Sequence, residues 1–299
     1  MKSMVEMREK VLSKERCTIA VAAAADLPVL EAIKDAVRVG LAKAILVGDK
    51  TKMTEYMKQL EMAEEQLEII DEPDVRKAAA QAVGFVRAGK AQVLMKGLIG
   101  TADFMRAVLN KEYGLRTGQE LTHVSVFDVP KINRLIIMSD PAMHTYPELN
   151  EKVKILEAIK QVSMVLEIEN PKIAVICAVE VVNPAMQPTM DAAILAKMCE
   201  RGQLKGMTVD GPLALDIALN KEAARHKGVT GAVAGKADAL LMPGIETGNV
   251  MWKTLAYMAD AEIGGAIVGA AAPIVLTSRS DSPSTKLNSI MLALLLAEN

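Results

Sequence analysis

Short hydrophobic runs alternate with amphipathic segments along this chain of 299 residues. In the first third, the runs at 17–24, 44–49 and 91–95 are apolar almost throughout rather than at every second position. Residues 27–39, between the first two runs, carry apolar side chains at helical spacing. Strands that are apolar on both faces are typical of parallel sheets covered by helices on each side. The alternation therefore predicts a three-layer α/β/α fold.

The second half of the chain repeats this pattern after a change near residues 135–145. Two runs, 122–127 and 135–139, follow each other across a short turn, which favours an antiparallel pair. A long amphipathic helix expected at 148–167 then starts a second series of elements. The length allows two domains, so we expect two α/β layers with a ligand cleft between them.

Within this second series, the sequence predicts strands at 172–179 and 238–242 and a helix at 190–201. Residues 209–212 are expected to open a further helix, and residues 249–259 are expected to form another.

Composition excludes several classes of protein. A formal net charge of −2 and 3% aromatic residues leave no electrostatic or stacking surface for nucleic acid. Cys17, Cys177 and Cys199 are widely spaced in apolar surroundings, which favours a reducing compartment over disulfides or a zinc site. The charged start shows no signal peptide, and the longest apolar run, 263–276, is too short and too interrupted to cross a bilayer. We expect a cytoplasmic protein without a membrane partner.

The polar stretch at 277–282 stands between an apolar run and a helical pattern that begins at Pro283. At such a turn, backbone N–H groups and the positive end of the helix dipole can hold an anion. Arg279 offers a guanidinium that matches phosphate, and Asp281 offers a carboxylate that can accept a proton. The alternative is that Asp281 or Ser282 only caps the helix.

Two further turns join an expected strand to an expected helix. In residues 96–106, Thr101 is expected to cap a helix, with Arg106 one turn after Asp103. That arginine either binds a ligand or forms a solvated pair with Asp103. Residues 242–249 are rich in glycine, which suits close approach of the backbone to a ligand, or else form a simple tight turn.

The sequence lacks three common motifs for binding nucleotides or metals. Residues 231–237 have the wrong spacing for a phosphate-binding P-loop, and Lys236 precedes a strand rather than opening a helix. No dinucleotide-binding Gly-x-Gly-x-x-Gly pattern occurs. His123, His144 and His226 have no metal-ligand spacing, so no metal site is predicted.

Taken together, these turns resemble the phosphate acetyl/butyryl transferase family. The resemblance covers essentially the whole chain and is strongest at 235–243, Gly248-Asn249, Lys253 and Ser278-Arg279. Residues 100–106, 177–184 and 210–216 also resemble family motifs, and the form of residues 278–282 is more similar to the butyryl than to the acetyl enzymes.

The resemblance implies a two-domain fold similar to isocitrate and isopropylmalate dehydrogenases, with a cleft between the domains. The last segment then returns to the first domain, giving 1–138 with 272–299 and, separately, 139–271. It also implies reversible transfer of a short acyl group between CoA and phosphate. CoA and phosphate are substrates, no cofactor or metal is implied, and a homo-oligomer is expected.

The resemblance also implies roles for individual residues. Arg279 would hold phosphate, Ser278 would hydrogen-bond the CoA sulfur or thioester, and Arg106 would help to bind phosphate. The acetyl enzymes place an aspartate where this chain has Thr285 or Lys286. Asp281 is the nearest carboxylate and is therefore assigned as the base. The remaining substrate-binding candidates are Thr101, Gly244, Gly248, Asn249 and Ser282.

Three alternatives remain open. The first is a dehydrogenase of the same fold, which would need a cluster of metal-binding aspartates that the sequence does not offer. The second is an acyl-CoA sensor that binds without reacting. The third is the same chemistry with acetyl-CoA.

Overall fold

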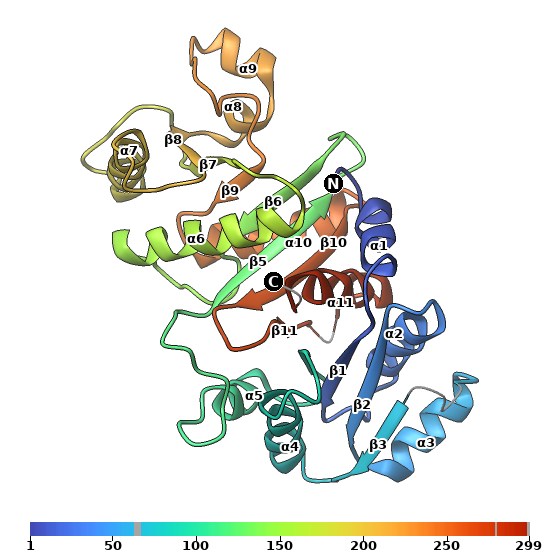
Figure 1. Cartoon of the computed structure of the whole chain (residues 1–299). Coiled ribbons are helices and arrows are strands. Elements are labelled where there is room, and N and C mark those ends of the chain that lie inside the picture. The colour runs from blue at the N-terminus through green and yellow to red at the C-terminus, as the bar shows by residue number, and fades with distance from the viewer. Residues whose placement is uncertain (63–66, 279, 298–299) are drawn as a thin grey trace. The chain divides into compact units, whose positions relative to one another are not determined.

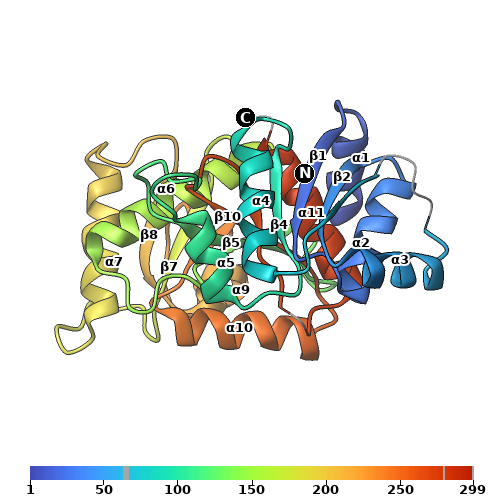
Figure 2. The ribbon, with the colours of Figure 1, turned by 90° about the horizontal axis from the view of Figure 1, so that it is seen from below.

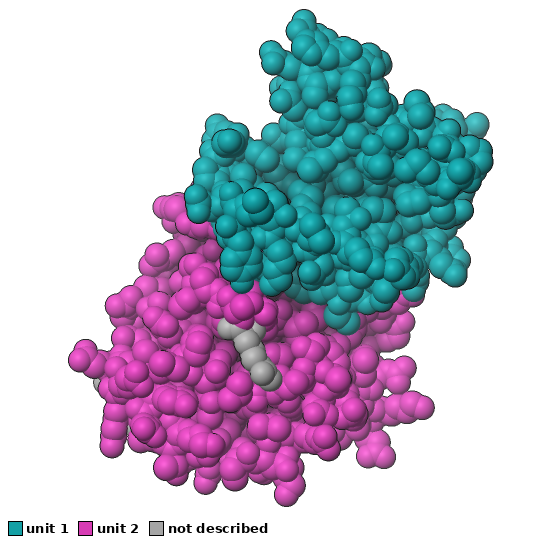
Figure 3. All heavy atoms as spheres, turned by 180° about the vertical axis from the view of Figure 1, so that it is seen from behind, with its two compact units in different colours: residues 1–3, 122–261 teal, residues 4–121, 262–299 magenta. Residues whose placement is uncertain are grey.

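The computed structural model describes residues 1–62, 67–278 and 280–297 (Figure 1). Helices and strands alternate along the chain and form two compact units, distinguished by colour in Figure 3. Unit 1 is Met1–Ser3 with Thr122–Ala261, and unit 2 is Met4–Leu121 with Glu262–Asn299. The domain boundaries drawn from the family resemblance stay a prediction.

Unit 2 contains the predicted parallel sheet. Its strands are β1 (Cys17–Ala22), β2 (Ala42–Gly48), β3 (Leu67–Asp71), β4 (Val93–Lys96), β10 (Glu262–Val268) and β11 (Ile274–Val275). They follow the order β3-β2-β1-β4-β11-β10, in which β10 alone runs antiparallel to its neighbour within the unit. Helices lie on both faces of this sheet, which is why its central strands are hydrophobic at nearly every position.

The helices of unit 2 divide between the two faces of its sheet. They are α1 (Met4–Leu12), α2 (Leu27–Arg38), α3 (Lys50–Gln59), α4 (Val75–Arg87), α5 (Thr101–Val108) and α11 (Pro283–Ala297). On one face α11 contacts α1 and α2, and α2 contacts α3; on the other, α4 contacts α5 (Figure 2). Residues 288–296 of α11 are all buried, so this helix anchors the end of the chain in the core.

Unit 1 contains a second sheet segment with its own helices. Its strands are β5 (Thr122–Asp128), β6 (Leu135–Ser139), β7 (Lys172–Ile176), β8 (Thr208–Leu213) and β9 (Ala239–Leu241), in the order β5-β6-β9-β7-β8. The predicted antiparallel pairing of β5 with β6 is confirmed, and the other neighbours are parallel. Its helices are α6 (Leu149–Val165), α7 (Gln187–Glu200), α8 (Leu215–Leu219), α9 (Lys221–His226) and α10 (Ile245–Met258).

The prediction that residues 209–212 open a helix is wrong. They lie inside β8, where Val209 and Asp210 pair in parallel with Ile173 and Ala174 of β7. A Cβ on Gly211 would lie 2.9 Å from the Cβ of Val175, so this glycine allows the two strands to approach closely. Tertiary pairing therefore overrides the helix-opening pattern of Asp-Gly-Pro.

Among the described residues, no helix combines the length and the hydropathy that crossing a bilayer requires.

Candidate functional site

The carboxyl ends of β4 and β11 place two of the predicted turns side by side in unit 2. The strands are parallel neighbours, with Ile274 opposite Leu94 and Val275 opposite Met95. Residues 97–100 follow β4, and residues 276–282 follow β11. Ligands of α/β proteins bind at this edge of the sheet, where parallel strands end and helices begin.

The segment 277–282, here called the serine turn, is held together by its own polar side chains. The backbone N–H of Ser278 donates to Oδ2 of Asp281 at 2.7 Å, and the hydroxyls of Ser278 and Ser280 lie 3.0 Å apart. Both serines are exposed. Arg279, the predicted phosphate ligand, lies outside the described residues. The structure thus brings together Ser278 and Asp281, two residues assigned to the chemistry.

Asp281 and Ser282 have different roles in this turn. Oγ of Ser282 accepts a hydrogen bond from the backbone N–H of Thr285 at 3.1 Å, which is the N-cap bond of α11. Asp281 is not needed for that cap. Its Oδ1 atom is buried and has no hydrogen-bond partner among the described residues. Of the two candidate caps, Ser282 therefore fills the position, and Asp281 keeps one carboxylate oxygen unengaged.

Lys286 supports the serine turn through hydrogen bonds to its backbone. The sequence did not predict it as a site residue. Its side chain is buried, with a relative exposure of 1%. Its ammonium donates to the backbone carbonyls of Ser278, at 3.3 Å, and Asp281, at 2.5 Å. Its position in the sequence could have indicated this burial, because Lys286 lies four residues before Ile290, on the buried face of the helix.

The turn after β4 is shaped by a glycine and supported by a second buried lysine. A Cβ on Gly97 would lie 2.3 Å from the carbonyl oxygen of Ala23, so no larger residue fits without a backbone shift. The ammonium of Lys96, a residue only 6% exposed, donates to the carbonyl of Gly97 at 3.2 Å. The backbone of this turn is therefore fixed against the end of β1.

The prediction that Thr101 caps α5 is wrong. Gly100 is the N-cap residue, Thr101 is the first helical residue, and no side chain caps this helix end. The backbone N–H of Phe104 donates to the carbonyl of Gly100, so the helix begins one residue earlier than the hydroxyl pattern indicated. Thr101 remains exposed at the start of the helix.

Arg106 lies on the surface of unit 2, where it forms an ion pair with Asp103. Arg76 approaches the same carboxylate oxygen, with its Nε at 3.4 Å. The side chain of Arg106 is 68% exposed, so this pair contributes little to stability. An exposed guanidinium can exchange its carboxylate for another anion, and its role as a phosphate ligand stays a prediction.

Residues 242–249 of unit 1, here called the glycine turn, are held by close backbone contacts. Helix α10 begins at Ile245 with Gly244 as its N-cap, so the prediction of a helix starting at Asn249 is wrong by one turn. A Cβ on Gly248 would lie 2.7 Å from the carbonyl oxygen of Asp140. Nδ2 of Asn249 donates to the carbonyl of Pro141 at 3.2 Å. Gly244, Gly248 and Asn249 thus gather at the start of one helix.

A tyrosine links the glycine turn to the loop after β6. The hydroxyl of Tyr146 donates to Oε1 of Glu246 in the first turn of α10. This bond stabilises the carboxylate and lowers the pKa of Glu246, while the same carboxylate raises the pKa of the Tyr146 hydroxyl.

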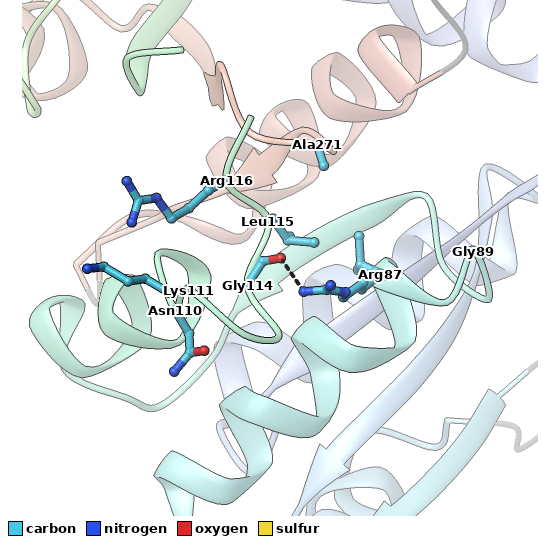
Figure 4. Close-up of a pocket in the computed structure, with 9 residues that line it drawn as sticks. Arg87, Gly89, Asn110, Lys111, Gly114, Leu115, Arg116 and Ala271 are labelled. Carbon is cyan, nitrogen blue, oxygen red and sulfur yellow. Dashed lines mark hydrogen bonds between the residues drawn. The ribbon is translucent and has the colours of Figure 1, made fainter. Parts of the chain in front are cut away.

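A hollow of about 450 Å³ in unit 2 contains none of the predicted site residues (Figure 4). Arg87 on its wall donates to the carbonyls of Glu112 and Gly114, and the latter bond is drawn in the figure. The hollow lies beside the carboxyl ends of α4 and α5, whose dipoles favour cations. Of the cationic residues that line the hollow, Arg87 therefore compensates backbone carbonyls.

A second hollow, of about 650 Å³, lies in unit 1 between α7, β8 and residues 231–233. Asp210 on its wall accepts from the backbone N–H of Gly211 at 2.9 Å, and burial raises the pKa of this carboxyl. Cys199 on the same wall bonds backbone groups of Met207 and Val209. Both polar groups are thus engaged within the protein.

The sequence and the fold of this chain match known acyl-transferring proteins. The family model described as phosphate acetyl/butaryl transferase matches residues 3–80 and 72–294. A phosphate butyryltransferase of Clostridium acetobutylicum is 57% identical over 298 residues, covering 100% of this chain and 99% of the relative. A phosphate acetyltransferase of Thermotoga maritima is 44% identical, over 93% of this chain and 95% of the relative.

A solved structure, a branched-chain phosphotransacylase from Enterococcus faecalis V583, is also similar. It superposes with a TM-score of 0.84 at 30% identity, over 95% of this chain and 99% of the other. These matches place the chain in a class of acyltransferases. This chain belongs to the phosphate acetyl/butyryl transferase family.

Proposed function

We propose that this chain transfers a butyryl group reversibly between CoA and inorganic phosphate. Butanoyl-CoA and phosphate give butanoyl phosphate and free CoA by direct attack within a ternary complex. The high identity to a butyryltransferase over the full length supports the choice of acyl group. No covalent enzyme intermediate is required, because both substrates are held together and one attacks the other.

In the direction of CoA acylation, the thiol must lose its proton before its sulfur attacks the acyl phosphate carbon. We assign Asp281 as the group that accepts this proton. The observation that carries the proposal is the unengaged Oδ1 atom of Asp281 in the turn that presents Ser278. Buried carboxylate oxygens are normally satisfied by hydrogen bonds, so an unpaired one indicates a place for a ligand proton.

The other assigned residues bind and orient the substrates. The hydroxyl of Ser278 is exposed and would hydrogen-bond the CoA sulfur or the thioester. Arg279 would form paired hydrogen bonds with phosphate oxygens, with help from Arg106. The ammonium of Lys286, fixed under the carbonyls of the serine turn, adds positive charge near the developing oxyanion.

Three further expectations belong to the same proposal. CoA and phosphate act as substrates and no other cofactor is used. Thr101, Gly244, Gly248, Asn249 and Ser282 contact the substrates through backbone or hydroxyl groups. The chain works in the cytoplasm as a homo-oligomer.

The test is phosphate-dependent release of CoA thiol from acetyl-, propionyl-, butyryl- and isobutyryl-CoA. We expect the four-carbon thioesters to react fastest. Fastest release from acetyl-CoA would retain the reaction and correct the substrate, in line with the acetyltransferase relative. CoA binding without release from any thioester would indicate a sensor instead.

Two variants test the residue assignments in the same assay. Asp281→Asn keeps an acceptor for the N–H of Ser278 but removes the base, so kcat should fall by about 100-fold or more. Arg279→Lys removes the planar fork and should lower turnover severely without affecting folding. Near-normal turnover in either folded variant would contradict the role assigned to that residue.

A further inference from the structure

We infer that Leu98 is the residue that gives this site its preference for an acyl chain longer than acetyl. The inference rests on the proposed function and extends it to a side chain that neither the family motifs nor the sequence pattern singled out. Leu98 lies in the turn after β4 and is 43% exposed, although the residues on either side of it are buried.

Hydrogen bonds fix the backbone around Leu98, whereas its side chain is exposed. Its N–H donates to the carbonyl of Ala23 at 2.8 Å, and the N–H of Gly97 donates to that of Ala22 at 2.8 Å. Ile99, the next residue, is only 3% exposed. This alternation leaves the leucine as an exposed apolar side chain on a fixed backbone, at the edge of the sheet that also carries the serine turn.

The sheet register relates Leu98 to Ser278. The last paired residues of the two neighbouring strands are Met95 and Val275. Leu98 and Ser278 each lie three residues beyond these paired residues, in the two turns that leave the sheet at the same carboxyl edge. Neighbouring parallel strands lie about 5 Å apart, so the two turns begin at a separation that a short acyl chain can span.

Two other exposed apolar residues of unit 2 do not meet this condition. Among the described residues, Val75 also follows a strand end, but its strand β3 is separated from β11 by β2, β1 and β4. Leu109, at 44% exposure, stands at the opposite end of α5 from the turn after β4. Leu98 therefore offers apolar surface beside the reacting group, and the additional methylene groups of a butyryl chain are the part of the substrate that such surface recognises.

The experiment compares kcat/KM for butyryl-CoA and acetyl-CoA in the full chain and three variants. Leu98→Ala should lower the ratio of butyryl to acetyl kcat/KM about fivefold, because one side-chain contact with the chain is lost. Leu98→Asn keeps a similar shape without apolar surface and should lower the ratio at least as much. Leu109→Ala removes an equally exposed leucine and should leave the ratio unchanged.

The outcomes separate this inference from the proposed function. An unchanged ratio in both Leu98 variants, or an equal loss with both thioesters, would overturn the inference while thiol release by the unaltered chain upholds the reaction. Absence of release from any thioester by the unaltered chain would overturn both. Thermal unfolding of each variant checks that the fold is retained.

Discussion

The serine turn and the glycine turn both connect the carboxyl end of a strand to the start of a long helix, yet their closest contacts differ in kind. In the serine turn, side chains make the bonds: Asp281 accepts from Ser278, Ser282 caps α11, and Lys286 binds two carbonyls. The glycine turn also has side-chain bonds, at Glu246 and Asn249, but its closest contact is between backbones: Gly248 has no side chain and brings α10 within contact of the backbone at Asp140.

This difference indicates that the serine turn takes part in the reaction and that the glycine turn fixes the geometry of the backbone. Hydroxyl, carboxylate and ammonium groups can exchange a bond with the protein for one with a ligand, so the serine turn suits charge and proton transfer. A glycine packed against backbone cannot adapt in this way, so the glycine turn fixes geometry instead. Substitutions should therefore affect the two turns through different measurable quantities.

The largest effect on stability is expected at the glycine turn. In Gly248→Ala the new methyl group would lie 2.7 Å from a carbonyl oxygen and 2.9 Å from the Cα of Pro141, and neither backbone atom can rotate away. Overpacking of this kind should lower the free energy of unfolding by about 3 kcal/mol. Urea denaturation measures it directly.

Gly84→Ala is the matched control for that substitution. Gly84 also lies inside a helix, but a Cβ there meets no atom within 4 Å. The alanine should raise the free energy of unfolding by about 0.5–1 kcal/mol, because glycine is the poorer helix former. If both variants changed stability in the same direction, the steric account of Gly248 would be wrong.

Cys177, at the carboxyl end of β7 in unit 1, tests whether that edge takes part in the chemistry. Burial raises the pKa of this thiol to about 11 from an ordinary 9.0. At pH 8 its thiolate population, and hence its alkylation rate in the folded protein, should be about 100-fold below that of an ordinary thiol. Mass spectrometry after iodoacetamide treatment would identify the modified cysteine.

The same shift has a consequence for stability against pH. The folded state holds the proton more tightly than the unfolded state, so the contribution is complete below pH 9.0 and is lost as the pH rises towards 11. Unfolding free energies of the unaltered chain should fall more steeply over this range than those of Cys177→Ala. Rapid alkylation of folded Cys177 at neutral pH, with full loss of activity, would instead indicate a reactive site thiol.

The next effect in size concerns the support of the serine turn. Lys286→Met leaves the carbonyls of Ser278 and Asp281 without their buried donor, which should lower the free energy of unfolding by about 2 kcal/mol. Turnover should fall as well, because the turn loses its geometry. Lys154→Met is the control, since the Lys154 side chain is 55% exposed and its ion pair with Glu157 contributes little. Equal stability of the two variants would contradict a supporting role for Lys286.

Much of the fold could be predicted because hydrophobic pattern and pairing agree. The runs that form β1, β2 and β4 are apolar at nearly every position, and parallel strands covered on both faces require that pattern. The helix predicted to open at residues 209–212 is wrong because Asp-Gly-Pro is also a helix-opening pattern, and only the pairing with β7 favours the strand. Local propensity cannot report a partner that is distant in the chain.

The candidate site was predictable in part for a related reason. The hydroxyls and carboxylate of the serine turn are visible as a polar interruption between apolar run and helix. The role of Lys286 was not, because a lysine in an apolar helix reads equally well as a surface residue. Lys286 can be buried because its ammonium donates to the backbone carbonyls of Ser278 and Asp281, which come close only in the folded turn.

The smallest effect on the free energy of unfolding is expected at Ser282, where capping of the helix can be distinguished from phosphate binding. Ser282→Ala removes the acceptor for the N–H of Thr285 and should lower the free energy of unfolding by about 1 kcal/mol. Ser282→Asn supplies a neutral capping side chain and should restore most of that loss. If Ser282 also contacts phosphate, as proposed, the asparagine variant should regain stability but keep a raised KM for phosphate. If the asparagine variant recovered both its stability and a normal KM for phosphate, Ser282 would only cap the helix. Substrate contacts of the serine turn would then come from the residues before Ser282.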